Sequence, residues 1–280
     1  MKKNYYTQMS NQYIFSLFNS MKKRKSNRFK NHHHTDIELG LMLKGKGEYI
    51  LNNVKYTADE GDLFIARSNE THCIPTISTE ALVAFNVQLS PFFLWNICSD
   101  YIPPNKIQAL INPDIPITNK LHDPEIIHCM KTISTLMESE DTTALYTIRS
   151  LVVKLITLVS EKADISDIAL TPPVKHLDDI QKSIGYIRRN YSKPINLDNM
   201  AKNAAMSPSY FSKIFRMVTG VSPYNYLMTI RIEKAVESLK TTNKTIMEIA
   251  LECGFQSITS FNKAFKNSVG CTPSEIRNEI

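Results

Sequence analysis

Two sets of polar and basic residues with the same spacing occur 50 residues apart near the C-terminus. Within each set the positions are i, i+3, i+4 and i+7, which fall on one face of an α-helix. Such side chains can bond to base edges and phosphates in the major groove of B-DNA, which admits an α-helix. We expect the first three residues of each set to read bases and the fourth to contact phosphate. The sets are Ser209, Ser212, Lys213 and Arg216, and Thr259, Asn262, Lys263 and Lys266.

The apolar residues of the two segments repeat in register with the polar ones. Phe211 and Phe215 correspond to Phe261 and Phe265, and a short apolar-periodic segment precedes each copy. One polar helix face alone would be interpreted as solvated surface, but two copies with lysine at the same place favour a binding surface. The repeated unit is therefore predicted to be a helix, a tight turn and a second helix, an arrangement used to bind DNA.

Local signals mark where these helices begin and end. A hydroxyl residue before a proline is typical of a helix start, the pattern S/T-x-x-E is a capping box, and glycine is typical of a helix end. Residues 223–239 between the two copies are predicted to form a spacer helix roughly 24 Å long, which could hold the polar faces about one DNA turn apart. The start signals are Ser207-Pro208, Ser222-Pro223, Thr272-Pro273 and Thr245 with Glu248, and the stop signals are Gly220 and Gly270.

Charge is distributed unevenly along the 280 residues. Residues 174–280 hold 15 of the 33 basic and 9 of the 27 acidic residues, so the formal net charge of +6 lies in this part. A basic part beside a neutral one is typical of a chain in which one part binds phosphate. The five cysteines are scattered and form no C-x-x-C pair, which argues against a zinc site or a disulfide framework and for a reducing compartment. With no apolar run of signal-peptide length, a cytoplasmic protein without a membrane partner is expected.

The first part of the chain has the pattern of a β domain. Short apolar or alternating runs are separated by glycine and asparagine, which predicts the strands of a sandwich or small barrel. The runs are 37–43, 48–51, 62–66 and 81–88.

Helical spacing replaces this pattern further along. Apolar residues at period 3.6 predict two helices between 123 and 162, joined by a polar loop at 138–143 into an antiparallel hairpin. The hairpin could cover the β domain or form a dimer interface. Residues 163–173 include two consecutive prolines and are predicted to be a linker. The expected domains are therefore 1–162, the linker 163–173, and an all-α domain at 174–280.

The C-terminal motifs together resemble the AraC/XylS family of transcription regulators. The resemblance implies a domain of seven helices with two helix-turn-helix units, and it places base contacts on Ser209, Ser212, Lys213, Thr259, Asn262 and Lys263. It extends over about 100 residues, and its pattern includes Tyr210-Phe211-Ser212-Lys213, Gly220, Ser222-Pro223, Arg231, Cys253-Gly254-Phe255, Phe265-Lys266 and Pro273.

The N-terminal part resembles the cupin-like β barrel with which this family binds effectors. His32, His34 and Glu38 match the first cupin motif in spacing, and His72 after Gly61 matches the second. The resemblance implies that these four side chains converge inside the barrel, where they could line an effector pocket, retain a metal ion such as Fe, Mn or Zn, or be purely structural. The second motif has Arg67 and Asn69 where cupins have proline and glycine. His33 is expected to point the opposite way along a strand and to be exposed.

These observations predict an α+β protein with an N-terminal cupin-like β barrel and helical hairpin and a C-terminal all-α domain with two helix-turn-helix units. The expected function is a transcription regulator that binds promoter DNA and responds to a small-molecule effector, such as a sugar, to control carbohydrate-utilisation genes. RNA polymerase and a second copy of the chain are expected partners, with no cofactor and no catalysis. The alternatives are a metal-dependent cupin enzyme with a helical appendage and a DNA-binding protein without an effector. The sequence leaves open whether the regulator activates or represses.

Overall fold

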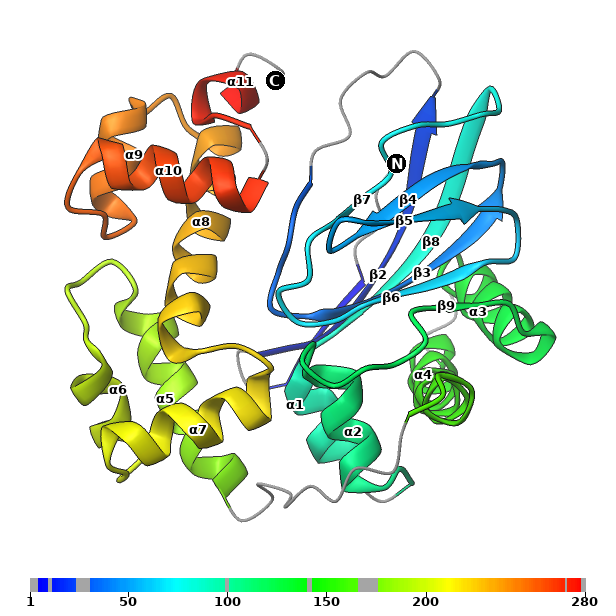
Figure 1. The fold of residues 1–280 in the computed structure, drawn as a ribbon, viewed down its shortest axis with the longest axis horizontal. Helices are drawn as coiled ribbons and strands as arrows, with labels where there is room; N and C mark the ends of the chain where they lie inside the picture. Colours follow the sequence, from blue (N-terminus) through cyan, green and yellow to red (C-terminus); the bar gives the residue numbers. More distant parts are fainter. Residues whose placement is uncertain are drawn as a thin grey trace. The chain divides into compact units, whose positions relative to one another are not determined.

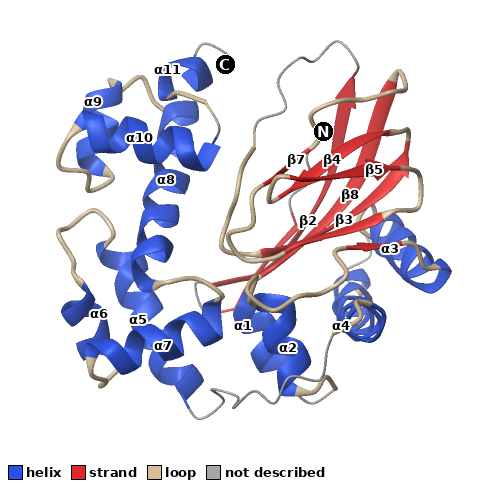
Figure 2. Ribbon diagram, viewed as in Figure 1, coloured by secondary structure: helices blue, strands red, loops and turns tan. Residues whose placement is uncertain are grey.

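The structure is a computed structural model that describes residues 5–9, 12–23, 31–98, 101–139, 143–165, 176–269 and 271–277. Contacts divide the chain into two compact units: the first contains Met1–Phe29 and Asp36–Pro172, and the second contains Lys30–Thr35 and Pro173–Ile280. Figure 1 colours the main part of the first unit from blue to green and the main part of the second, Pro173–Ile280, from yellow-green to red. The strands lie in the first unit, and the helices α5 to α11 lie in the second (Figure 2).

Two antiparallel sheets form the β domain. The larger sheet has the strand order β1-β2-β8-β3-β6-β9, and the smaller has the order β5-β4-β7. The described strands therefore form two sheets and do not close into one barrel. The β domain is an open version of the expected cupin-like barrel. The larger sheet contains β1 (Tyr5–Met9), β2 (Gln12–Lys23), β8 (Ala81–Leu89), β3 (Ile37–Lys44), β6 (Leu63–Ala66) and β9 (Lys120–Leu121), and the smaller contains β5 (Val54–Ala58), β4 (Gly47–Leu51) and β7 (His72–Cys73).

Side chains from both sheets form the hydrophobic core between them. Six consecutive residues of β3 are buried, which is typical of a strand covered on both faces. The hairpin from β4 to β5 turns at Asn52 and Asn53, whose φ angles of 47° and 67° suit the two-residue turns that match strand twist. The core cluster contains Met42, Tyr49, Leu51, Ala58, Phe64, Ala66, Ile74, Ile77, Leu82 and Ala84.

Several elements of the β domain were not expected from the sequence. Strand β2 pairs along its length with β8, from Phe15 opposite Leu89 to Lys23 opposite Ala81. After β8 the chain continues into α1 (Pro91–Phe93), a π-helical turn η1 (Leu94–Cys98) and α2 (Pro104–Ile111). Trp95 in η1 is almost fully buried, so this segment belongs to the core of the unit.

The predicted helical hairpin is confirmed. It consists of α3 (Pro124–Leu136) and α4 (Ala144–Lys162), which pack against each other. The carboxylate of Asp123 accepts hydrogen bonds from the backbone N–H groups of Glu125 and Ile126, and this caps α3. Ile126, Met130 and Ile133 on α3 are buried, as the apolar stripe predicted.

The second unit contains seven helices within its described residues, as the resemblance implied. The spacer helix α8 is two residues longer at its C-terminal end than expected from the sequence. The predicted linker lies largely outside the described residues, as do the start of the domain at 174 and the stop signal Gly270. The helices are α5 (Leu177–Asn190), α6 (Leu197–Asn203), α7 (Pro208–Thr219), α8 (Pro223–Thr241), α9 (Ile246–Glu252), α10 (Ile258–Val269) and α11 (Pro273–Arg277).

A search of the helices in the described ranges finds none with the length and apolarity that a membrane span requires.

Candidate DNA-reading helices and effector site

The sequence repeat becomes two helix-turn-helix units of the same construction. The first unit is α6 with α7, and the second is α9 with α10. The rings of Phe211 and Phe215 lie 5.3 Å apart at 59°, and those of Phe261 and Phe265 lie 5.5 Å apart at 57°. All four rings are fully buried. The apolar faces of α7 and α10 therefore anchor both helices in the same way.

The polar sets lie on the opposite faces of these two helices. Ser209, Lys213 and Arg216 are exposed on α7, and Ser212 between them is half-buried. On α10 all four residues of the set, Thr259, Asn262, Lys263 and Lys266, are exposed. The structure thus brings each predicted set together on one accessible helix face. Ala264, next to Phe265 on α10, is only partly buried.

The ends of α7 follow only part of the expected capping pattern. Gly220 ends the helix with φ at 79°, a left-handed conformation that favours glycine, and its N–H donates to the carbonyl oxygen of Arg216. Ser207 precedes the helix in an extended conformation, but its side chain makes no capping hydrogen bond.

Tyr226 on α8 packs edge to face on Phe215, with ring centroids 5.5 Å apart. Arg188 on α5 donates to the Tyr226 hydroxyl, which ties α5 to the α7–α8 contact.

In the second helix-turn-helix unit, side chains cap the N-termini of both helices. Thr245 and Glu248 form the predicted capping box, in which each side chain accepts from the other's backbone N–H. Ser257 accepts from the N–H of Ser260 at the start of α10. Below these caps an apolar cluster that includes Ile249, Phe255 and Phe261 packs against Leu239 of α8. These local contacts fix the turn between α9 and α10.

One buried arginine joins the spacer helix α8 to both helix-turn-helix units. The Nε atom of Arg231 on α8 donates to the carbonyl oxygen of Tyr191, 2.8 Å away, and a terminal nitrogen donates to that of Lys193, 3.0 Å away. Both carbonyls lie in the loop that leads to α6. The guanidinium carbon also lies 5.8 Å from the ring centroid of Phe255, in the second helix-turn-helix unit. Burial lowers the pKa of Arg231 from its usual value.

The four residues of the predicted effector site also come together. The ligand atoms of His32, His34, Glu38 and His72 lie within 4.8 Å of one another. Glu38 and His72 are buried, whereas His34 is half-buried and His32 is exposed. His33 is half-buried and lies before β3 begins at Ile37, so the prediction of an exposed strand residue is wrong.

Neighbouring side chains hold the two buried members of this histidine–glutamate cluster. Gln88 is directly opposite Glu38 in the β3–β8 ladder, and its Nε2 donates to Glu38 Oε2 over 2.7 Å. The Nδ1 atom of His72 lies 3.0 Å from the carbonyl oxygen of Glu70. The Tyr49 ring stacks on His72 with centroids 6.3 Å apart. Burial, with the nearby Glu38 carboxylate, raises the pKa of Tyr49 well above its usual value.

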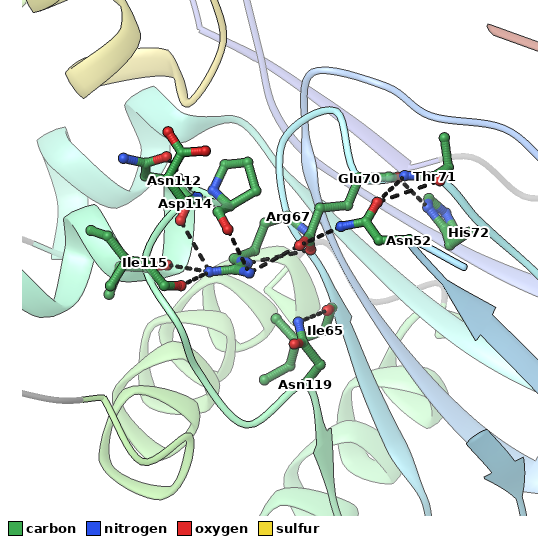
Figure 3. A network of polar contacts seen from close by, with 12 residues as sticks. Asn52, Ile65, Arg67, Glu70, Thr71, His72, Asn112, Asp114, Ile115 and Asn119 are labelled. Carbon is green, nitrogen blue, oxygen red and sulfur yellow. Dashed lines mark hydrogen bonds and ion pairs between the residues drawn. The ribbon is translucent and has the colours of Figure 1, made fainter. Parts of the chain in front are cut away.

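A buried ion pair supports the turn that carries His72 (Figure 3). A terminal nitrogen of Arg67 lies 2.9 Å from Glu70 Oε1, and both side chains are almost fully buried. The other terminal nitrogen of Arg67 donates to the carbonyls of Ala109, Asn112 and Ile115, at and beyond the end of α2. Glu70 in turn accepts from the Asn52 amide at the β4–β5 turn. The pair therefore connects the turn before β7 to the end of α2 through Arg67 and to the β4–β5 turn through Glu70.

The turn keeps its shape despite the departures from the cupin motif. Asn69 stands where cupins have glycine and has φ at 65°, the left-handed conformation that asparagine tolerates better than most residues. Arg67 replaces proline and makes the ion pair just described. Neither departure removes His72 from the cluster. The supporting residues Gln88 and Arg231 were not identified as such from the sequence, because their partners lie far away along the chain.

Comparisons with known proteins agree with this division of the chain. The family described as AraC-like ligand binding domain matches residues 23–149, and the family described as Helix-turn-helix domain matches residues 200–279. SoxS, a regulatory protein of Escherichia coli, is 31% identical over 107 residues, which are 38% of this chain and 100% of SoxS. The chain belongs to the AraC/XylS family of transcription regulators. It is therefore a DNA-binding transcription regulator with an N-terminal effector-binding domain.

Two AraC/XylS relatives match most of the chain. The melibiose operon regulatory protein of Escherichia coli is 22% identical over 259 residues, which are 88% of this chain and 82% of that protein. The solved structure of ToxT from Vibrio cholerae has a TM-score of 0.66 and 16% identity, and the match covers 95% of this chain and 99% of that one. At 16% identity, the likeness to ToxT shows a shared fold and nothing further.

Proposed function

We propose that α7 and α10 enter successive major grooves of promoter DNA and read different bases. Ser209, Ser212 and Lys213 would read one segment, and Thr259, Asn262 and Lys263 would read the other. Arg216 and Lys266, one turn further along each helix, would contact phosphates. The observation that carries this proposal is the shared construction of the two units, in which buried phenylalanine pairs turn both polar faces outward. Because the two sets differ in sequence, the operator should lack repeat symmetry.

The experiment is operator selection followed by single substitutions. DNA fragments are selected with the purified full chain, and binding is measured for Lys213→Ala, Lys263→Ala and the control Lys240→Ala, an exposed lysine of α8 outside both sets. Each test variant should lose about 1–3 kcal/mol of binding free energy and should relax base preference in one half of the operator only. Wild-type binding by both test variants would refute this assignment of the reading faces.

We further propose that the β domain binds a small-molecule effector at His32, His34, Glu38 and His72. A sugar is the first class to test, since one relative that matches most of the chain is named for the melibiose operon. An effector that binds only the folded state must raise apparent stability, by about 2.7 kcal/mol at 100 times its dissociation constant. A sugar screen by thermal shift should therefore find a ligand whose effect is lost in His34→Ala. A broad screen without any shift would favour regulation without a sugar effector.

We also propose the domain bounds, the partners and the cellular compartment of the chain. The β domain and hairpin would extend over 1–162, the linker over 163–173, and the DNA-binding domain over 174–280. The α3–α4 hairpin would pair two copies of the chain, and the DNA-bound protein would contact RNA polymerase. Its five cysteines are free thiols, which suits the cytoplasm. We propose that the histidine–glutamate cluster serves binding and not turnover, which assays of candidate ligands for chemical change would test.

A further inference from the structure

We propose that Gly254 is a positioning residue that sets where the second helix-turn-helix unit lies relative to the first. Gly254 lies in the turn between α9 and α10. The proposal rests on the proposed function, which takes α7 and α10 as the two DNA-reading helices, and it adds the contact that holds them at a fixed separation.

The turn between the two helices has the same hydrogen bonding in both helix-turn-helix units. In the first, Ala205 has φ at 52°, and the N–H of the next residue donates to the carbonyl oxygen of Ala201 over 3.1 Å. In the second, Gly254 has φ at 85°, and the N–H of the next residue donates to the carbonyl oxygen of Ala250 over 3.0 Å. Alanine is thus accommodated in the left-handed conformation of this turn. The conformation alone therefore does not account for glycine at position 254.

The space around these two residues differs. Ala205 is exposed. A Cβ atom at Gly254 would lie 2.7 Å from the carbonyl oxygen of Tyr191 and 2.9 Å from that of Ser192. Both distances are shorter than van der Waals contact, and both neighbours are backbone atoms that cannot rotate away. Glycine is therefore required by the close approach of this turn to the loop that leads to α6.

Two further contacts connect this close approach to α10. The Nε atom of Arg231 donates to the same carbonyl oxygen of Tyr191 over 2.8 Å. The guanidinium of Arg231 also lies 5.8 Å from the ring centroid of Phe255, the residue after Gly254. The Phe255 ring meets that of Phe261 on α10 edge to face, with centroids 5.1 Å apart, and both rings are buried. Because buried rings are closely packed, a displaced turn should move α10 with it.

A fixed separation strengthens DNA binding because the second helix binds in an intramolecular step once the first is bound. Linking two binding modules raises affinity for a joint site by about 10²–10⁴-fold without any new contact, and this gain is lost when the geometry forbids simultaneous binding. Gly254→Ala should therefore weaken binding to the whole operator and leave binding to each half unchanged. A local folding defect in the second unit would instead weaken binding to the half read by α10.

The first test compares whole and half operators with the full chain. A half operator carries random sequence in place of one of the two segments, and binding is measured by competition at low salt, which strengthens weak DNA complexes. Gly254→Ala should lose at least about 10-fold in affinity for the whole operator and less than about 2-fold for either half. The control Ala205→Gly changes the matching turn, which makes no such close approach, and should bind as the wild type does.

The second test needs no DNA. Nitroxide labels are attached to Asn203→Cys on α6 and Asn267→Cys on α10, which are exposed positions, whereas the five native cysteines are buried. Distances between the labels, measured by pulsed electron paramagnetic resonance, should form one narrow distribution that Ala205→Gly leaves unchanged. Gly254→Ala should shift or broaden this distribution. Arg231→Lys, which keeps the glycine but weakens the same contact, should also broaden it and provides the test if Gly254→Ala does not fold.

The outcomes separate this inference from the proposed function. An unchanged label distribution in both folded Gly254→Ala and Arg231→Lys overturns the inference. Unchanged affinity of folded Gly254→Ala for the whole operator also overturns it, and so does an equal loss for the whole operator and the half read by α10. If the wild type selects no operator, the assignment of the reading faces fails and the label distances alone decide the inference. Circular dichroism and urea denaturation establish that each variant is folded.

Discussion

The Nε2 atom of His176 lies 2.8 Å from the hydroxyl oxygen of Tyr210, and the two rings meet edge to face with centroids 5.4 Å apart. Tyr210 lies in the first turn of α7, directly after Ser209. His176 is the first described residue beyond the predicted linker, and its Nδ1 lies 3.7 Å from Asp179 Oδ2. The contact therefore connects the start of the DNA-binding unit to the first turn of a helix that we propose reads DNA.

Removing this contact should weaken binding in one half of the operator. His176→Ala should cost about 0.5–1.5 kcal/mol of DNA-binding free energy, the net value of one hydrogen bond, because α7 loses a support at its N-terminal turn. The loss should be confined to the operator half read by α7, as measured by titration of mutated operators. Tyr210→Phe should have a similar effect, and the double variant should be no worse than either single one. Additive losses would mean that the two residues act separately.

Arg231 should be a major contributor to the stability of the helical unit. Arg231→Met leaves the carbonyls of Tyr191 and Lys193 without these donors, and we expect a loss of about 2–3 kcal/mol in the free energy of unfolding. Arg231→Lys can replace at most one of the two bonds in this geometry. Its unfolding free energy should therefore lie between those of the wild type and Arg231→Met. Urea denaturation followed by circular dichroism measures both. Lys240→Met on the same helix is the matched control, and an equal loss there would contradict the argument.

Asp62 should make the β domain sensitive to acid. Burial acts to raise the pKa of Asp62, but hydrogen bonds from Lys120, the Asp59 backbone and His122 outweigh it and hold that pKa below its usual value. A lowered pKa contributes stability that is fully present above about pH 4, the unfolded value, and is lost as pH falls through the folded pKa. Asp62→Asn should therefore be less stable than wild type at pH 7, and the difference should shrink in strong acid. Urea titrations at several pH values test this, with the exposed Glu60→Gln as control.

The buried pair of Arg67 and Glu70 should respond asymmetrically to substitution. Arg67→Met leaves a carboxylate buried without its partner and should cost about 3–5 kcal/mol of unfolding free energy. The double variant Arg67→Met with Glu70→Leu should recover part of that loss, since no charge then remains buried. Thermal and urea unfolding of the wild type and both variants give the comparison. A double variant less stable than the single one would show that the remaining hydrogen bonds of Glu70, from the Asn52 amide and the Arg67 backbone N–H, outweigh the cost of its buried charge.

The helices near the C-terminus could be predicted because their signals are local. The capping box of Thr245 and Glu248, the cap from Ser222 to Asn225 and the left-handed Gly220 all act within a few residues. Strand β2 could not be predicted in this way, because its partner β8 lies far along the chain. Ser207 shows the limit of local signals, since its type and position suit a cap that its side chain does not make.

The histidine–glutamate cluster shows the same division. Motif spacing identified His32, His34, Glu38 and His72, which the structure brings together. Spacing could not place His33, because residues 32–34 precede β3 and do not alternate as strand residues do. It also could not identify Arg67 as an anchor, since its acceptors at Ala109 and Ile115 lie 42 and 48 residues away in sequence.

The length of α8 and the double attachment of Arg231 have a consequence for promoter architecture. A helix of 19 residues is about 28 Å long and cannot stretch, and Arg231 contacts both helix-turn-helix units from it. Each base pair inserted between two bound DNA segments moves one of them by about 3.4 Å and rotates it by about 34°. A single inserted base pair should therefore disengage one of the two helices, whereas substitutions at uncontacted central positions should be tolerated.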